Sequence, residues 1–149
     1  AKERAEKGHL KQHSIHYLQA DAQAVPLLAE SIDCVTIAYG IRNIKDPLKC
    51  LKEVSRVLKP GGVFGILELT QPANPLMRWG HKFYLKNVLP LIGKVVASNK
   101  EAYTYLRNSI NTFIPPETLT ALLNEAGFTD VKRHPLMGGI ATIITGIKS

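Results

Sequence analysis

Two apolar runs with a helix-like stretch between them organise the centre of the chain. Residues 32–38 form a nearly continuous β-branched run, which is typical of a strand buried on both faces. Residues 63–69 form a second apolar strand. Between them, apolar side chains recur every three or four positions and predict a helix over residues 47–58. These side chains are Leu48, Leu51, Val54 and Leu58.

The boundaries of this helix carry their own signals. Asp46 is expected to cap its first turn, and Pro47 suits the first helical position. Gly61 and Gly62 are expected to stop it, because glycine accepts the positive φ of a helix end or a tight turn. Further upstream, a short apolar alternation predicts another strand over residues 14–19.

The second half of the chain predicts helices and then a hairpin. Residues 72–112 have apolar positions at helical spacing and are expected to form an inserted helical layer, with one helix over residues 100–112. Paired prolines begin a further helix over residues 115–127. Two final strands, residues 130–136 and 140–147, are expected to pair through a Gly-Gly turn.

This order of elements predicts an α/β fold in one domain. The sheet is expected to be doubly wound and mostly parallel, with an antiparallel C-terminal strand. A chain of 149 residues is long enough to bury one core. In open sheets of this kind, ligands bind outside the carboxyl ends of the strands. Arg42 and Asn43 follow one strand and Glu68 ends the next, so the three are expected to share a site.

Charge and cysteine content narrow the function classes. The net charge is +7, but the 19 lysines and arginines stand in ones and twos, which favours a solvated basic surface. A membrane-surface role is the second interpretation, and no nucleic-acid partner is expected. Cys34 and Cys50 do not make a disulfide framework, so free thiols in a reducing cytosol are expected. No metal site is expected, because His9 and His13 have no carboxylate nearby in sequence.

The chain resembles the ubiquinone/menaquinone C-methyltransferase family, whose members use S-adenosylmethionine. Five stretches carry the resemblance: Tyr-Gly-Ile-Arg-Asn at 39–43, Arg-Val-Leu-Lys-Pro-Gly-Gly at 56–62, Leu-Glu-Leu-Thr at 67–70, Asp-Ala-Gln at 21–23 and Tyr-Thr-Tyr-Leu at 103–106. Ala-Gly-Phe at 126–128 and the last apolar strand continue it over nearly the whole chain. The family usually has serine where this chain has Thr70, a change that keeps the hydroxyl.

The resemblance implies a Rossmann-like methyltransferase fold that lacks its N-terminal strands in this chain. Such a domain normally begins with a Gly-rich turn against the cofactor, yet only Gly8 precedes Gly40. The chain is therefore expected to be the C-terminal two-thirds of an enzyme and to be inactive alone.

Four residues are expected to hold the cofactor. In the resembled fold, Asp21 accepts a hydrogen bond from the adenine amino group and Ala22 lies beside it. Tyr39 and Gly40 end a strand at the cofactor crevice, where glycine lets the backbone approach a ligand closely. The alternatives are a turn or cap aspartate and an ordinary strand-ending glycine.

Arg42, Asn43 and Glu68 are the candidate catalytic residues. Methylating a ring carbon requires a neighbouring hydroxyl to lose its proton, after which the carbon attacks the sulfonium methyl. An arginine stays protonated, so Arg42 is expected to favour the phenolate rather than act as the base. Asn43 could orient the ring oxygen or a water, and Glu68 could orient Arg42. The alternatives are a surface pair for Arg42, a helix cap for Asn43 and a structural salt bridge for Glu68.

Trp79, Phe83 and Tyr103 are the candidate substrate contacts. Prenylated quinone precursors live in membranes, so the basic, amphipathic segment around Trp79 and Phe83 could line a tail groove or lie on lipid. An ordinary lid layer or a homodimer contact is the alternative. The expected location is the cytoplasm, at the inner face of the membrane if the protein is peripheral.

The resemblance thus implies transfer of a methyl group to a ring carbon of a polyprenylated quinol, in menaquinone or ubiquinone biosynthesis. A methyltransferase for another lipid or small molecule remains open, because a fold does not fix the acceptor. A non-catalytic lipid- or partner-binding domain also remains open.

Overall fold

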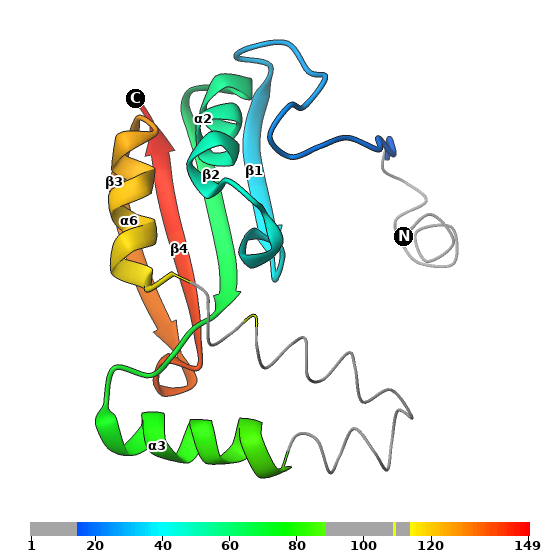
Figure 1. Ribbon diagram of the computed structural model, residues 1–149. Helices are drawn as coiled ribbons and strands as arrows, with labels where there is room; N and C mark the ends of the chain where they lie inside the picture. The colour runs from blue at the N-terminus through cyan, green and yellow to red at the C-terminus, as the bar shows by residue number, and fades with distance from the viewer. Residues whose placement is uncertain (1–14, 89–108, 110–113) are drawn as a thin grey trace.

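A four-stranded sheet with two helices packed on it forms the body of the molecule (Figure 1). The computed structural model describes residues 15–88, 109 and 114–149. The strands are β1 (Ile32–Ala38), β2 (Leu58–Leu69), β3 (Phe128–Leu136) and β4 (Ala141–Lys148), in the order β1-β2-β4-β3. β1 pairs with β2 in parallel, whereas β4 is antiparallel to both of its neighbours. Three strands therefore run one way and β4 runs the other, which confirms the predicted sheet.

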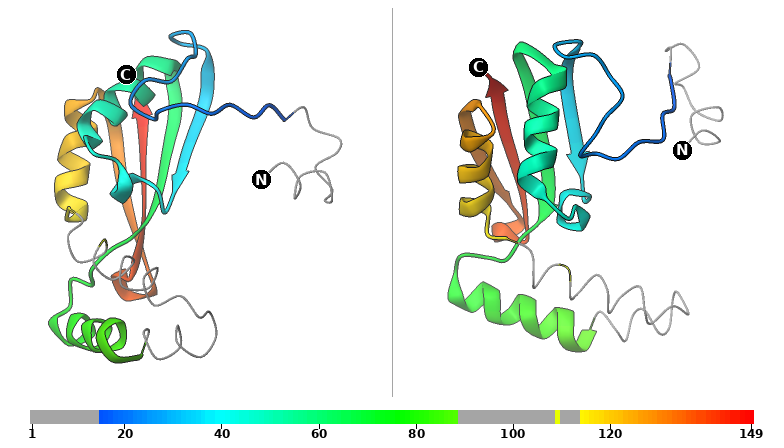
Figure 2. Two further views of the ribbon diagram at one scale, coloured as in Figure 1. Left: turned by 45° about the vertical axis from the view of Figure 1, so that its right-hand side comes forward. Right: turned by 45° about the horizontal axis from the view of Figure 1, so that its top comes forward.

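Two helices cover one face of this sheet, as the views in Figure 2 agree. They are α2 (Pro47–Val57) and α6 (Pro116–Glu125). The core between helices and sheet combines Leu51 and Val54 of α2, Leu119 and Leu123 of α6, Phe64 and Ile66 of β2, and Ile144 of β4. The rings of Phe64 and Phe128 lie 5.5 Å apart in this core. Within the described ranges, no helix covers the opposite face, where the second layer of a doubly wound fold would lie.

The predicted start of α2 is confirmed, but its end differs. The Asp46 side chain accepts from the main-chain N–H of Lys49 at 3.0 Å, and Pro47 is the first helical residue. The helix ends at Val57, before the glycines that were expected to stop it. Leu58 is already extended, and Lys59 precedes a proline, which disfavours helical backbone. Gly61 instead takes a positive φ of 77° inside the irregular start of β2.

The C-terminal helix and hairpin follow the prediction closely. α6 ends at Glu125, and Gly127 follows with a φ of 91°, as is common just beyond a helix end. β3 and β4 pair as an antiparallel hairpin across the turn η4 (Met137–Gly139).

The strand predicted over residues 14–19 is wrong for the described residues 15–19, which form no regular structure. Ile15, Tyr17 and Leu18 are exposed there, and no described strand pairs with them. An apolar alternation without a neighbouring strand has no partner for its backbone hydrogen bonds, so it does not form a strand in isolation.

The predicted inserted layer is helical where it is described. α3 (Pro75–Phe83) continues into the single π-turn η3 (Tyr84–Val88). α3 lies across the end of the sheet where β2 finishes (Figure 1). The helix predicted over residues 100–112, with Tyr103, lies outside the described residues, apart from Ser109.

Candidate functional site

The candidate site begins where β1 ends at the edge of the sheet. The N–H of Tyr39 still bonds to the Leu67 carbonyl of β2 at 2.8 Å, and the chain then turns away. Tyr39 takes a positive φ of 53°, whereas Gly40 has an ordinary φ of −118°. A Cβ on Gly40 would lie 3.2 Å from the Ile37 side chain. A larger residue at position 40 would be crowded against Ile37, and the left-handed backbone that turns the chain belongs to the tyrosine.

The turn η2 (Ile41–Asn43) brings Arg42 back over the end of β2, where it forms an ion pair with Glu68. Ile41 is fully buried and fixes this turn to the core. The side chains of Arg42 and Glu68 are only 9% and 1% exposed. The sequence prediction that these two residues lie together is therefore confirmed by their contact.

The Glu68 carboxylate is held on three sides. Oε1 accepts from Arg42 Nη1 and, at 2.8 Å, from the main-chain N–H of Leu69. Oε2 lies 3.4 Å from the main-chain nitrogen of Arg42. A carboxylate with this many donors is fixed in orientation, and it fixes the guanidinium in turn.

One donor of this pair is not used. Arg42 Nε is buried and has no hydrogen-bond partner within the part of the chain that the structure describes. A buried N–H without an acceptor is costly, so this position fits a ligand oxygen or a water. Arg42 can therefore offer a charge-assisted hydrogen bond to an anionic oxygen at this edge of the sheet.

Asn43 closes the same turn. Its N–H donates to the Gly40 carbonyl at 3.0 Å, and the residue is exposed. Asn43 thus lies next to the Arg42–Glu68 pair in the chain and is accessible to a ligand at that edge.

Asp21 and Ala22 lie in an exposed turn on the way to β1. Oδ1 of Asp21 accepts from the main-chain N–H of Gln23 at 2.9 Å and from its amide group at 3.3 Å. These hydrogen bonds hold the pKa of the Asp21 carboxyl below its usual value. Both end on Oδ1, which leaves Oδ2 available as an acceptor. Ala22 packs against the core beside this turn.

Trp79 and Phe83 stack on each other on α3, with ring centroids 6.0 Å apart. Together with Leu76 they form one face of the helix, since the three stand three and four residues apart. They are 68%, 53% and 77% exposed, respectively. The structure therefore brings Trp79 and Phe83 together, but it does not bring them to Arg42.

The opposite side of α3 packs inward. Arg78 donates to the carbonyls of Pro72 and Ala73 at 2.9 and 3.1 Å, and His81 is buried. A side chain on Gly138 would collide with Met77, so the helix rests directly on the β3–β4 turn. The side of α3 that contacts the body therefore includes Met77, Arg78 and His81, whereas the apolar face of Leu76, Trp79 and Phe83 is exposed.

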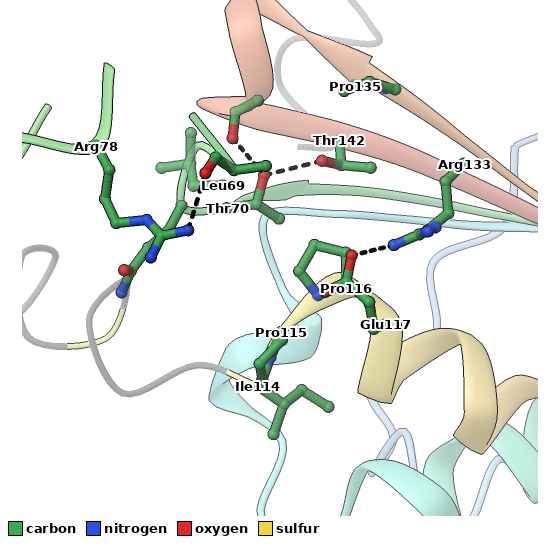
Figure 3. Close-up of a pocket in the computed structure, with 13 residues that line it drawn as sticks. Leu69, Thr70, Arg78, Ile114, Pro115, Pro116, Glu117, Arg133, Pro135 and Thr142 are labelled. Atoms are coloured by element: carbon green, nitrogen blue, oxygen red, sulfur yellow. Dashed lines mark hydrogen bonds and ion pairs between the residues drawn. The ribbon is translucent and has the colours of Figure 1, made fainter. Parts of the chain in front are cut away.

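A cavity of about 730 Å³ lies between α3, the start of α6 and the end of the β2–β4–β3 sheet (Figure 3). Of the residues that line this cavity, the sequence analysis pointed to Thr70 but missed Thr142, Arg133, Glu117 and Arg78. They come from the four separate elements α3, α6, β3 and β4, and tertiary packing brings them together. No local motif marks them in the sequence.

Metal binding finds no support in the described ranges, which contain no cluster of three potential ligands. His9 and His13 lie outside those ranges.

Comparisons with known proteins show the family of the chain. The family model for the ubiE/COQ5 methyltransferase family matches residues 1–148. The chain is 53% identical over 148 residues to a demethylmenaquinone methyltransferase of Protochlamydia amoebophila, covering 99% of this chain and 61% of that protein. It is 42% identical over 135 residues to a ubiquinone/menaquinone biosynthesis C-methyltransferase of Saccharophagus degradans, covering 91% of this chain and 54% of that protein.

Solved structures agree on the fold. An Aquifex aeolicus SAM-dependent methyltransferase superposes with a TM-score of 0.60 at 18% identity, covering 99% of this chain and 61% of that one. A Thermotoga maritima SAM-dependent methyltransferase, described as a possible histamine N-methyltransferase, also gives 0.60 at 21% identity, covering 99% and 70%. The sheet is therefore of the Rossmann-like methyltransferase type, and the chain belongs to the ubiE/COQ5 methyltransferase family.

Proposed function

We propose that the protein carrying this chain transfers a methyl group from S-adenosylmethionine to a ring carbon of a polyprenylated quinol. The chain spans 61% and 54% of the two relatives above, and their names are those of quinone-biosynthesis methyltransferases. The observation that carries the proposal is the buried Arg42 guanidinium, which is fixed by Glu68 and whose buried Nε–H has no partner in the described part of the chain.

In this proposal Arg42 acts on the acceptor. Ring-carbon methylation needs the neighbouring ring oxygen in its anionic form, because that charge makes the carbon nucleophilic. A fixed guanidinium in a dry site favours the anion over the neutral hydroxyl and thereby lowers the pKa of the acceptor. Glu68 is a positioning residue, since it touches Arg42 rather than the ring. Asn43 orients the ring oxygen or the water that takes its proton.

The candidate cofactor residues fit the adenosine end of S-adenosylmethionine. Oδ2 of Asp21 can accept from an exocyclic amino group, Ala22 follows it in the same turn, and Tyr39 and Gly40 lie where β1 ends. The cofactor supplies an electrophilic methyl on a sulfonium. During transfer a bond forms from the ring carbon to the methyl, the carbon–sulfur bond breaks, and the ring carbon then loses its proton. The protein contributes position and electrostatics.

Kinetics of two cation variants test this role. Arg42→Ala in the full gene-encoded protein should lower the rate of methyl transfer about a hundredfold or more, in line with loss of one oxyanion donor. Lys45→Ala, which removes an exposed cation three residues away, should leave the rate unchanged. Calorimetric affinity for S-adenosylmethionine should be the same in both variants. Full activity in a folded Arg42→Ala protein would remove Arg42 from the mechanism.

We also propose that residues 72–112 form a substrate lid layer whose α3 touches the membrane surface. No helix of the described ranges has the length and apolarity needed to cross a bilayer. The outer face of α3 is apolar, the exposed Lys82 and Lys86 follow on the same segment, and the chain has a net charge of +7. Such a helix suits the boundary of an anionic bilayer.

Trp79 offers a direct readout, because it is the single tryptophan of the chain. Vesicles with anionic phospholipid should shift its fluorescence to shorter wavelength, and purely zwitterionic vesicles should do so less. Leu76→Gln with Phe83→Gln should weaken binding while the fold is retained. A concentration-dependent shift without lipid, accompanied by dimerisation, would assign this face to a homodimer instead.

A further inference from the structure

The loop of residues 21–31 leads into β1 and contains no helix and no strand (Figure 1). Its first four residues form a closed turn. The N–H of Ala24 donates to the Asp21 carbonyl at 3.0 Å, and the N–H of Gln23 donates to the Asp21 carboxylate at 2.9 Å. Because Val25 follows this turn directly, the contacts that hold Val25 also set the place of the Asp21 carboxylate.

Two side chains of α2 hold the loop through its main chain. Glu53 and Arg56 stand three residues apart and therefore share one face of the helix. Oε1 of Glu53 accepts from the N–H of Val25 at 2.8 Å. Arg56 donates from Nη2 to the Val25 carbonyl and from Nη1 to the Leu27 carbonyl, both at 3.0 Å. Both main-chain polar groups of Val25 are thus bound by side chains of α2.

The same two side chains fix each other. Arg56 donates from Nε to Oε2 of Glu53 at 2.8 Å and from Nη2 to Oε1 at 2.7 Å. Such a bidentate pair holds both planar groups in one orientation. The hydrogen bonds from Arg56 hold the pKa of Glu53 below its usual value, so Glu53 stays an ionised acceptor at neutral pH. A lysine could not make this set of contacts, because its ammonium lacks the planar fork of a guanidinium.

The main chain at the end of α2 holds the other end of the loop. The N–H groups of Glu30 and Ser31 donate to the carbonyls of Arg56 and Val57, each at 2.9 Å. The side chains of Arg56 and Glu53 are 40% and 14% exposed, and a partly exposed pair of this spacing contributes little to overall stability. Most side chains of the loop are exposed, so these main-chain contacts decide where it lies.

We propose that Glu53 and Arg56 are positioning residues for the adenosine end of the cofactor. They hold the main chain at Val25 and Leu27, and through the adjoining turn they keep Asp21 where it accepts from the exocyclic amino group. Neither side chain touches the cofactor itself. The inference rests on the proposed function, which assigns that amino group to Asp21.

Two ligands that differ by one group test the inference in the full gene-encoded protein. They are S-adenosylhomocysteine and its analogue in which hydrogen replaces the exocyclic amino group. Calorimetry should show that the unchanged protein binds S-adenosylhomocysteine about tenfold more tightly, as expected for a hydrogen bond to a carboxylate. In Arg56→Ala, S-adenosylhomocysteine should lose about this factor and the analogue much less, so the preference should largely disappear.

Lys52→Ala is the matched control, because it removes a cation from the same helix. The partner of Lys52 is Glu125 of α6, which lies outside the loop. Both affinities should stay within about twofold of the unchanged protein. Glu53→Gln serves as a second variant if Arg56→Ala does not fold. It keeps the size of the side chain, removes the charge that fixes Arg56, and should also reduce the preference.

Steady-state kinetics separate positioning from a general loss of folded protein. Arg56→Ala should raise the KM for S-adenosylmethionine about tenfold and leave kcat unchanged, whereas loss of folded protein would lower kcat at an unchanged KM. An undiminished preference in the folded variants, or equal losses of affinity for both ligands, would overturn the inference. So would the absence of any preference in the unchanged protein. A protein that shows the predicted preferences but methylates no quinol would remove the proposed function and leave the positioning role standing.

Discussion

Arg42 and Glu68 lie 26 residues apart in the chain and form an ion pair that is almost entirely withdrawn from solvent. Both are delivered to the same edge by parallel strands, β1 through the turn η2 and β2 directly. Removing one partner of a buried pair leaves the other charge without compensation. The Arg42–Glu68 ion pair therefore affects both the stability of the fold and the chemistry proposed at this edge of the sheet.

Glu68→Gln should destabilise the fold by about 3–5 kcal/mol, because Arg42 would remain buried without its carboxylate. Urea denaturation measures the change in the free energy of unfolding. Asp33→Asn is the control, since it breaks the exposed Lys59–Asp33 pair and should cost less than about 1 kcal/mol. Similar losses of unfolding free energy in the two variants would show that burial does not increase the contribution of the Arg42–Glu68 pair to stability.

Asp46→Ala should cost about 1 kcal/mol by removing the cap of α2. The lost bond runs from the main-chain N–H of Lys49 to the Asp46 carboxylate. Lys49→Ala keeps that N–H and should leave stability nearly unchanged. Thermal melts of both variants separate the cap from side-chain effects, and a larger loss for Lys49→Ala would refute the capping role.

His81 should make the fold sensitive to mild acid. Burial lowers the pKa of His81, so the folded protein binds this proton less readily than the unfolded chain. Its contribution is complete above the unfolded pKa of about 6.5 and is lost as the pH falls through the lower folded value. The free energy of unfolding should therefore drop as the pH falls below about 6.5. The drop should be smaller in His81→Gln. An identical drop in the unchanged protein and in His81→Gln would show that His81 is not the group responsible.

The two cysteines should differ in reactivity. Burial, followed by the charges of Asp21 and Glu53, raises the pKa of Cys50 to about 11, whereas Cys34 is exposed. At pH 8 only roughly one Cys50 thiol in a thousand is a thiolate, and thiolate is the reactive form. Iodoacetamide should therefore modify Cys34 in the native protein and both cysteines in urea, as peptide mass mapping can follow. Rapid modification of Cys50 in the native state would contradict this.

Much of the fold follows from local signals in the sequence. The period of Leu48, Leu51 and Val54, with Asp46 and Pro47 before it, specifies α2 because the cap and the apolar stripe are both local. β1 and the β3–β4 hairpin follow from apolar runs and a glycine turn, although β1 is half-buried on one face and exposed on the other instead of buried on both faces as expected. The contact between Arg42 and Glu68 was predictable as well, since adjacent parallel strands place their carboxyl ends at one edge.

Other features depend on contacts that no local pattern records. The apolar alternation at residues 15–18 predicts a strand, but a strand forms only where another strand can pair with it. The positive φ at the end of β1 belongs to Tyr39, while Gly40 has an ordinary φ and lies close to the Ile37 side chain. The cavity combines Arg78, Glu117 and Arg133 from distant elements, so tertiary packing alone brings these residues together.

Transfer of a labelled methyl group tests the central claim most directly. The full gene-encoded protein would be incubated with S-adenosylmethionine carrying a ¹³C methyl and with a reduced demethylmenaquinone, and the product examined by NMR. The account predicts a new ¹³C methyl on a ring carbon, formed far more slowly by Arg42→Ala. A label on a ring oxygen, or no transfer by a folded protein that binds the cofactor, would contradict it.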